Sequence, residues 1–138
     1  MSTKKTILLG LAASLIAASP AAAAGTATIT ISHEMKGCHM WQLGNGKLTP
    51  NLTATLKAGT VLRFVNNDIM PHRLIQSGGP KVTLVHPNMN HLSAIASVKL
   101  AHRGTYRFTT KPGEDYKIFA GHETIGEDYV LHLTVHVR

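Results

Sequence analysis

The chain of 138 residues contains a single cysteine, Cys38. One thiol cannot form a disulfide within the chain, so no disulfide framework stabilises this fold. In an exported protein, a lone thiol is explained by burial as a small apolar side chain, by pairing with another chain, or by service as a thiolate ligand. Thiolate ligation is the explanation with chemical consequences, and we carry it forward as a hypothesis.

Acidic residues are also scarce, because seven Asp and Glu stand against fourteen Lys and Arg. These acids show no pair arranged for acid–base catalysis, and the sequence has neither a nucleophile elbow nor a phosphate-binding loop. We therefore expect the protein not to be an enzyme. The basic residues are scattered rather than gathered in runs, which predicts no nucleic-acid-binding stripe and no polybasic membrane patch.

The first 24 residues resemble a secretory signal peptide. Lys4 and Lys5 precede an apolar run from Thr6 to Ala18, and small residues follow as a cleavage site at 19–24. A membrane anchor is the alternative, but the run is alanine-rich and shorter than the roughly 20 apolar residues that a spanning helix needs. We expect one mature domain at 25–138, periplasmic or secreted, with no membrane span.

No helical pattern of useful length occurs in this mature domain, where short alternating segments are separated by turn-forming residues. In the last segment, residues 129, 131, 133, 135 and 137 share one apolar face, with His132 and His136 on the other face. We expect strands at 26–32, 52–57, 61–65, 72–76, 82–85, 94–100, 106–110 and 129–137, with 33–41 as a loop. This spacing predicts an all-β sandwich, with Trp41 as a packing residue.

The alternation of strand directions places loops 33–40, 68–72, 86–91 and 111–128 at one end of the sandwich, and His102 at the other. Thiolate, imidazole and thioether groups select copper or zinc over magnesium or calcium, and methionine favours copper. A single methionine is more often a core-packing residue than a ligand, and a single histidine is as often a surface residue. The predicted cluster contains Cys38, His33, His39, His72, His86, His91, His122, Met35, Met40, Met70 and Met89.

Four segments resemble the cupredoxin family, to which plastocyanin and azurin belong. They are LKAGTV at 56–61, the loop from Asn66 to Pro71-His72, GTYRF at 104–108 and LHLTV at 131–135. The resemblance implies a Greek-key β-sandwich with a metal at its loop end and His72 as the first histidine ligand. The chain departs from the family after GTYRF, where the usual loop holding Cys, His and Met offers only His122.

We therefore predict one copper ion, bound by Cys38 and His72 with a second histidine and a methionine. His86 and Met89 lie three residues apart and can supply both, and His39 is a further candidate. Three functional hypotheses follow: one-electron transfer with a redox partner, periplasmic copper buffering or delivery to a copper-transfer partner, and a metal-free interaction module. The residues that compete for places in the ligand set are His33, Met70, His91 and His122.

Overall fold

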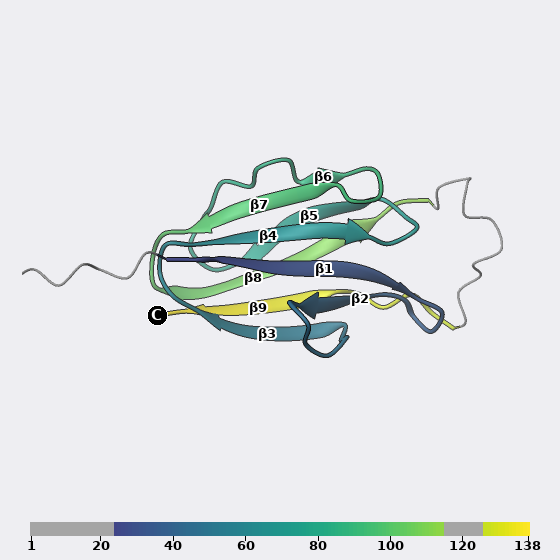
Figure 1. The fold of residues 1–138 in the computed structure, drawn as a ribbon, viewed down its shortest axis with the longest axis horizontal. Helices are drawn as coiled ribbons and strands as arrows, with labels where there is room; N and C mark the ends of the chain where they lie inside the picture. The colour runs from purple at the N-terminus through teal and green to yellow at the C-terminus, as the bar shows by residue number, and fades with distance from the viewer. Residues whose placement is uncertain (1–23, 115–125) are drawn as a thin grey trace, which may run out of the picture.

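Two β-sheets pack face to face in the computed structural model, which describes residues 24–114 and 126–138 (Figure 1). Those residues contain no helix, so the predicted all-β sandwich is confirmed. The strands are β1 (Thr26–Glu34), β2 (Cys38–Leu43), β3 (Asn51–Leu56), β4 (Thr60–Asn67), β5 (His72–Gly78), β6 (Asn88–Met89), β7 (Ile95–Leu100), β8 (Gly104–Pro112) and β9 (His132–Val137).

One sheet has the strand order β2-β1-β4-β7, and the other has the order β3-β9-β8-β5-β6. Strands β1 and β4 are parallel, as are β3 and β9, and the remaining pairs are antiparallel. Because β1 and β4 run the same way, the end of β1 and the end of β4 meet at one pole of the sandwich. Strand β5 starts from that pole and β8 ends there, as the pairing of His72 with Pro112 requires.

The core lies between the two sheets and is made from alternate residues of each strand. Trp41, Phe64 and Phe108 form an aromatic chain across it, with ring centroids 5.9 and 5.8 Å apart in successive pairs. Trp41 is completely buried, which confirms its expected packing role. Strand β9 begins at His132 rather than at the expected residue 129, and Tyr129 is only half-buried. The two faces are confirmed for the rest of the segment, because Leu131, Leu133, Val135 and Val137 are buried while His132 and His136 are exposed.

The expected loop at 33–41 is wrong, because this segment is a hairpin of β1 and β2. Strand β1 continues to Glu34 and β2 begins at Cys38, with only three residues between them. Sequence alternation broke at this point because the inward positions change from isoleucine to histidine. His33 and His39 are register partners and extend the inward row of Ile31 and Trp41.

The expected strand at 82–85 is also wrong. Only Val85 forms a bridge from this segment, to Ser97 of β7, with N···O distances of 2.8 and 3.0 Å. The segment alternates because Val82 and Leu84 pack half-buried against the core while the residue between them faces solvent. A full strand would need a partner along its length, and the segment has only this single bridge.

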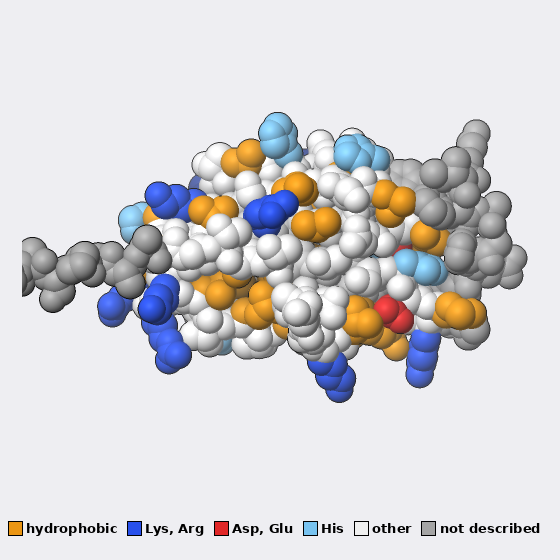
Figure 2. Space-filling model, in the orientation of Figure 1, with side chains coloured by type: hydrophobic (Ala, Val, Ile, Leu, Met, Phe, Trp, Pro, Cys, Tyr) orange, Lys and Arg blue, Asp and Glu red, His pale blue; other side chains and the backbone are white. Residues whose placement is uncertain are grey.

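Two predictions fall on residues outside the described ranges. The signal-peptide segment lies there except for Ala24, and His122 lies in the other gap. In residues 24–114 and 126–138, no helix has the length and apolar character needed to cross a bilayer. On the face drawn in Figure 2, several lysine and arginine side chains lie near the left end and the others are spread along the molecule. The absence of a nucleic-acid partner stays a prediction.

Candidate metal centre

Two connections at one pole of the sandwich bring potential metal donors together. The β1–β2 hairpin contributes His33, Cys38 and His39, and the β4–β5 connection contributes Asp68 and Met70, with His72 opening β5. The parallel pairing of β1 with β4 sets this arrangement, because Ser32 lies opposite Asn67 where both strands approach their ends. The predicted convergence of these two segments is therefore confirmed.

Gly37 allows the hairpin to turn within three residues. Its φ of +77° is readily adopted by glycine, and a Cβ at this position would collide with the Tyr129 ring. The carbonyl of Gly37 accepts hydrogen bonds from the backbone N–H groups of His39 and Tyr129, at 2.8 and 2.9 Å. The hairpin is thereby tied to the segment that leads into β9.

Asn66, completely buried at the end of β4, organises the connection to β5. Its Nδ2 donates to the carbonyls of Met70 and Met89, at 3.0 and 3.1 Å, and its Oδ1 accepts from the Asp68 N–H at 3.0 Å. These bonds hold a short, buried loop, whose backbone groups would otherwise be costly to remove from water. The Asp68 side chain is consequently directed toward the histidines.

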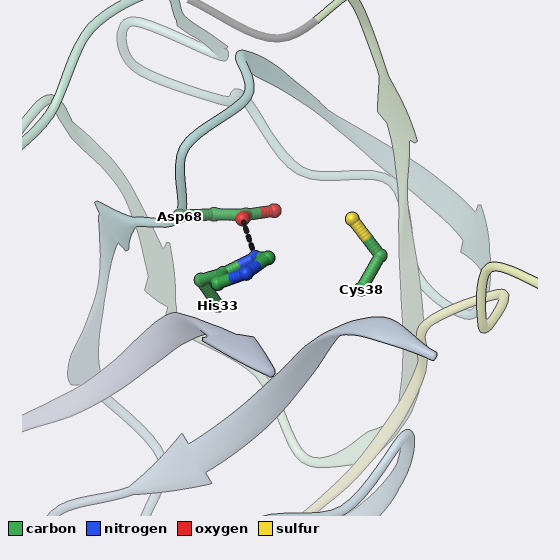
Figure 3. Close-up of side chains that lie close together, drawn as sticks. All are labelled: His33, Cys38 and Asp68. Atoms are coloured by element: carbon green, nitrogen blue, oxygen red, sulfur yellow. Dashed lines mark ion pairs between the residues drawn. The ribbon is translucent and has the colours of Figure 1, made fainter. Parts of the chain in front are cut away.

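The Asp68 carboxylate lies among three imidazoles. Its Oδ1 is 3.3 Å from His33 Nδ1, the contact drawn in Figure 3. Its Oδ2 accepts a hydrogen bond from His72 Nε2 at 2.6 Å and lies 3.4 Å from His39 Nδ1. Asp68, His39 and His72 are at most 1 % exposed, so a charged carboxylate is held almost entirely inside the protein.

The imidazoles keep Asp68 ionised despite its burial. Burial raises the pKa of Asp68, but the neighbouring His39 and His72 outweigh that effect and lower the pKa from its usual 3.8 to about 2. For His72, burial is the largest influence and lowers its pKa, while Asp68 partly opposes the change. The ground state near neutral pH is therefore an ionised carboxylate that accepts the Nε2–H of a neutral His72.

The orientation of His39 exposes one nitrogen to the cluster. Its Nε2 donates to the carbonyl oxygen of Tyr129 at 2.6 Å, and a carbonyl can only accept, so the proton of the neutral ring is on Nε2. Its Nδ1 is buried and has no hydrogen-bond partner among the described residues. In the neutral ring a lone pair therefore faces the Asp68 carboxylate at 3.4 Å, and a proton or a metal cation between the two atoms would stabilise this contact.

Two sulfur atoms lie beside the histidines. The thiol of Cys38 and the thioether of Met70 are 4.0 Å apart, and the two residues are 1 % and 7 % exposed. Two sets of donor atoms lie within 4.8 Å of one another: His33, Cys38 and Asp68 form one, and His39, Asp68 and His72 form the other. Asp68 belongs to both sets.

The structure brings some of the predicted ligands together and not others. Cys38, His39 and His72 all reach the pole, but Cys38 and His72 fall in different donor sets. Met89 is buried beside His72 as its register partner. His86 is exposed, and the neighbouring Pro87 carbonyl bonds the N–H of Leu74 partway along β5.

The competing residues divide in the same way. His33 and Met70 join the cluster, whereas His91 is exposed and its Nδ1 contacts the carbonyl of Leu92. Asp68 was not among the candidate ligands predicted from the sequence, which placed it only within the loop from Asn66 to His72, and its central position was missed. The four-residue spacing of Asp68 and His72 around a proline was the available signal, and it does not specify burial.

Comparisons with known proteins give no family assignment. No protein-family model matches the chain, and no curated protein matches it. Among solved structures, it is similar to a plastocyanin from Dryopteris crassirhizoma, with 14 % identity over 80 % of this chain and 99 % of that one, at a TM-score of 0.45. An oxidised amicyanin mutant has 16 % identity over 80 % of each chain, at a TM-score of 0.40.

The similar structures carry names of different kinds. An inclusion body protein from Burkholderia cenocepacia has 8 % identity over 88 % of this chain and 98 % of that one, with a TM-score of 0.45. At TM-scores this low, none of these similarities carries weight in assigning a function. The sandwich architecture is established by the strands of this chain, and the chemistry must come from its own residues.

Proposed function

We propose that this chain is an exported, cupredoxin-like protein, not an enzyme, that binds one copper ion and transfers single electrons. Its copper donors are Cys38 Sγ, Met70 Sδ and the His33 imidazole, with Asp68 Oδ1 beside them. The observation that carries the proposal is the buried pair of sulfur atoms, 4.0 Å apart at the end of the sandwich where the histidines converge.

The donor chemistry suits copper. Thiolate and thioether ligands with imidazole select copper, whereas magnesium and calcium take oxygen ligands. Two sulfur ligands of one ion lie about 3.8 Å apart when both bonds are about 2.3 Å, and farther apart when the thioether bond is long. The separation of 4.0 Å between Cys38 and Met70 agrees with this geometry.

Burial and backbone pairing support electron transfer. Glu34 and Cys38 are register partners in the hairpin, as are His33 and His39, so strand hydrogen bonds hold the donors in place. A fixed, water-excluding site needs little rearrangement when its charge changes. Copper, when bound, supplies a Cu(II)/Cu(I) couple that accepts one electron from a reduced protein partner and returns it to an oxidised one. His33, whose side chain is 15 % exposed, links the site to the surface.

Copper buffering or delivery is the second candidate, and the position of Met35 favours it. Met35 lies in the turn of the hairpin, three residues before Cys38, and is 63 % exposed, which leaves a thioether on the surface. An exposed thioether can receive Cu(I) before it moves inward. This candidate predicts tighter binding of Cu(I) than of Cu(II), and copper exchange with a partner protein.

The substitution Cys38→Ser tests the proposal in the purified chain. We expect the wild-type protein to bind one copper ion with intense visible absorption from the thiolate. In Cys38→Ser, this absorption should disappear and copper affinity should fall by more than about 100-fold, because losing a ligand costs more than losing a residue that orients one. Absorption, paramagnetic resonance and competition with a copper chelator measure these effects.

His102→Ala is the matched control, because His102 is exposed at the opposite end of the sandwich. It should leave the absorption and the copper affinity unchanged. Unaltered copper binding in Cys38→Ser would contradict thiolate ligation. A wild-type protein that takes up no copper would favour a metal-free interaction module instead.

A further inference from the structure

We propose that the same pole contains a second metal position, in which His39 Nδ1, Asp68 Oδ2 and His72 Nε2 bind one divalent first-row cation of the zinc type. This position is adjacent to the proposed copper donors and shares the Asp68 carboxylate with them. The inference goes beyond the copper proposal and does not depend on it, because none of its three donor atoms is a sulfur.

The His39 ring provides the first observation. Its Nε2–H is committed to the Tyr129 carbonyl at 2.6 Å, so in the neutral ring Nδ1 is an acceptor. That atom is buried, in a residue 1 % exposed, and has no hydrogen-bond partner among the described residues. A buried acceptor without a partner costs free energy, and a cation bound by its lone pair removes that cost.

The distances within the set agree with coordination of a small ion. A tetrahedral ion with bonds of about 2.0 to 2.1 Å separates its ligand atoms by about 3.3 to 3.4 Å. His39 Nδ1 and Asp68 Oδ2 are 3.4 Å apart. His72 Nε2 lies nearer, at 2.6 Å from Asp68 Oδ2, because it donates a hydrogen bond there. Binding requires a short outward movement of this one ring.

Both imidazoles have a partner that holds the nitrogen facing away from the ion. Tyr129 does so for His39, and Thr110 Oγ1 lies 2.9 Å from His72 Nδ1. When His72 Nε2 donates to Asp68, its Nδ1 accepts a hydrogen bond from the Thr110 hydroxyl. When Nε2 binds a cation, the ring proton resides on Nδ1 and is donated to Thr110, since a hydroxyl serves either way. Such outer partners are typical of histidine ligands.

The carboxylate separates the two positions. Asp68 Oδ2 faces His39 and His72, while Asp68 Oδ1 faces His33 at 3.3 Å. Two nitrogen donors and one oxygen donor suit zinc, whereas the set containing the Cys38 thiol suits copper. The Asp68 carboxylate thereby joins the sulfur-containing copper position to the nitrogen and oxygen donors of the zinc position. Its negative charge, shared between two cations, offsets their mutual repulsion.

Zinc titration of the full, metal-free chain tests the inference. We expect native mass spectrometry to show one zinc ion added to the protein already loaded with one copper ion. His39→Ala and Thr110→Val should weaken zinc binding, measured by calorimetry, by more than about 100-fold and by about 10- to 100-fold respectively. The Thr110 variant removes no metal donor, so it tests the site even if His39→Ala fails to fold.

His136→Ala is the matched control, because His136 is exposed on β9 and distant in register from the pole. No zinc uptake by the metal-free chain, displacement of zinc by the first equivalent of copper, or zinc affinity unchanged in both site variants would overturn the inference. The copper proposal fails separately, through loss of the thiolate absorption. Zinc binding that persists in Cys38→Ser would support the second position whatever the outcome for copper.

Discussion

Asp68 is the only acidic side chain that is buried among the described residues. Its negative charge is compensated by the hydrogen bond from His72 and by the Ile69 N–H, which donates to Oδ1 at 2.7 Å. A buried charge without such partners would be strongly destabilising. At the scale of the residue, this carboxylate orients the histidines in the metal-free protein and supplies an oxygen to each proposed metal position.

The pKa values of Asp68 and His72 predict that the metal-free protein loses stability in acid. A carboxyl whose pKa is lowered on folding, from 3.8 to about 2, contributes stability above pH 4 that is lost as the pH falls toward 2. His72, whose pKa is also lowered, acts in the same direction because the unfolded chain binds its proton more readily. We expect Asp68 to contribute about 2 kcal/mol to this loss.

Urea unfolding of the metal-free wild type and of Asp68→Asn, at pH values from 7 to 2.5, measures the effect. The variant should show a flatter dependence of unfolding free energy on pH below 4. Glu127→Gln, at an exposed acid, should retain the wild-type profile. If the unfolding free energy of Asp68→Asn fell as steeply below pH 4 as that of the wild type, Asp68 would not be the source of the acid sensitivity.

At the scale of the element, the β1–β2 hairpin decides whether the donors meet. Its turn depends on Gly37, and Cys38 itself has a φ of +65°, uncommon for a residue with a side chain. This backbone conformation directs the chain back within three residues and places Cys38 opposite Glu34. Backbone strain at a potential ligand is maintained by the surrounding hydrogen bonds, including those to the Gly37 carbonyl.

Gly37→Ala should destabilise the protein by about 2 to 4 kcal/mol, because the methyl group adds a collision with the Tyr129 ring to the cost of a positive φ. Gly44→Ala is the matched control, with a φ of +53° and nothing within 4 Å of the added Cβ. It should cost only about 1 kcal/mol. Chemical denaturation compares the two, and equal losses would mean that the Tyr129 contact is unimportant.

At the scale of the whole molecule, two sheets bury a common core and leave the metal pole at one end. The parallel pairs β1–β4 and β3–β9 join segments that are separated in sequence, one pair in each sheet. Strands β1, β3, β4 and β9 therefore depend on partners brought from elsewhere in the chain. The donors are positioned by this packing, because the pairing of β1 with β4 places the hairpin beside the β4–β5 connection.

Strand β9 offers a test of the sandwich as a cooperative unit. Leu133→Ala should lower the unfolding free energy by about 2 to 5 kcal/mol, since Leu133 is 1 % exposed in the core. His132→Ala, at the exposed neighbouring position, should change it by less than about 0.5 kcal/mol. Thermal unfolding followed by circular dichroism measures both variants, and similar losses would contradict the two-faced packing of this strand.

Much of this fold was accessible from local pattern. Alternation predicted the segments that became β1, β3, β4, β7, β8 and β9, because an inward apolar residue at every second position is a property of the strand itself. The prediction failed at 33–41, where histidines occupy the inward positions. The alternation of apolar and polar residues identifies a strand only where its inward side chains are hydrophobic, so it cannot identify a strand whose inward side chains form a buried polar cluster.

By itself, the sequence determined the class of fold, the convergence of segments 33–40 and 68–72 at one pole, and the scarcity of other reactive groups. These follow from composition and from the order of strands and turns along the chain, both of which can be read without knowing the tertiary structure. Tertiary structure alone decided that Cys38 lies with His33 and Met70, that His39 and His72 lie with Asp68, and that His86 is excluded. Distances between donors depend on register and burial, which arise only when distant strands pair.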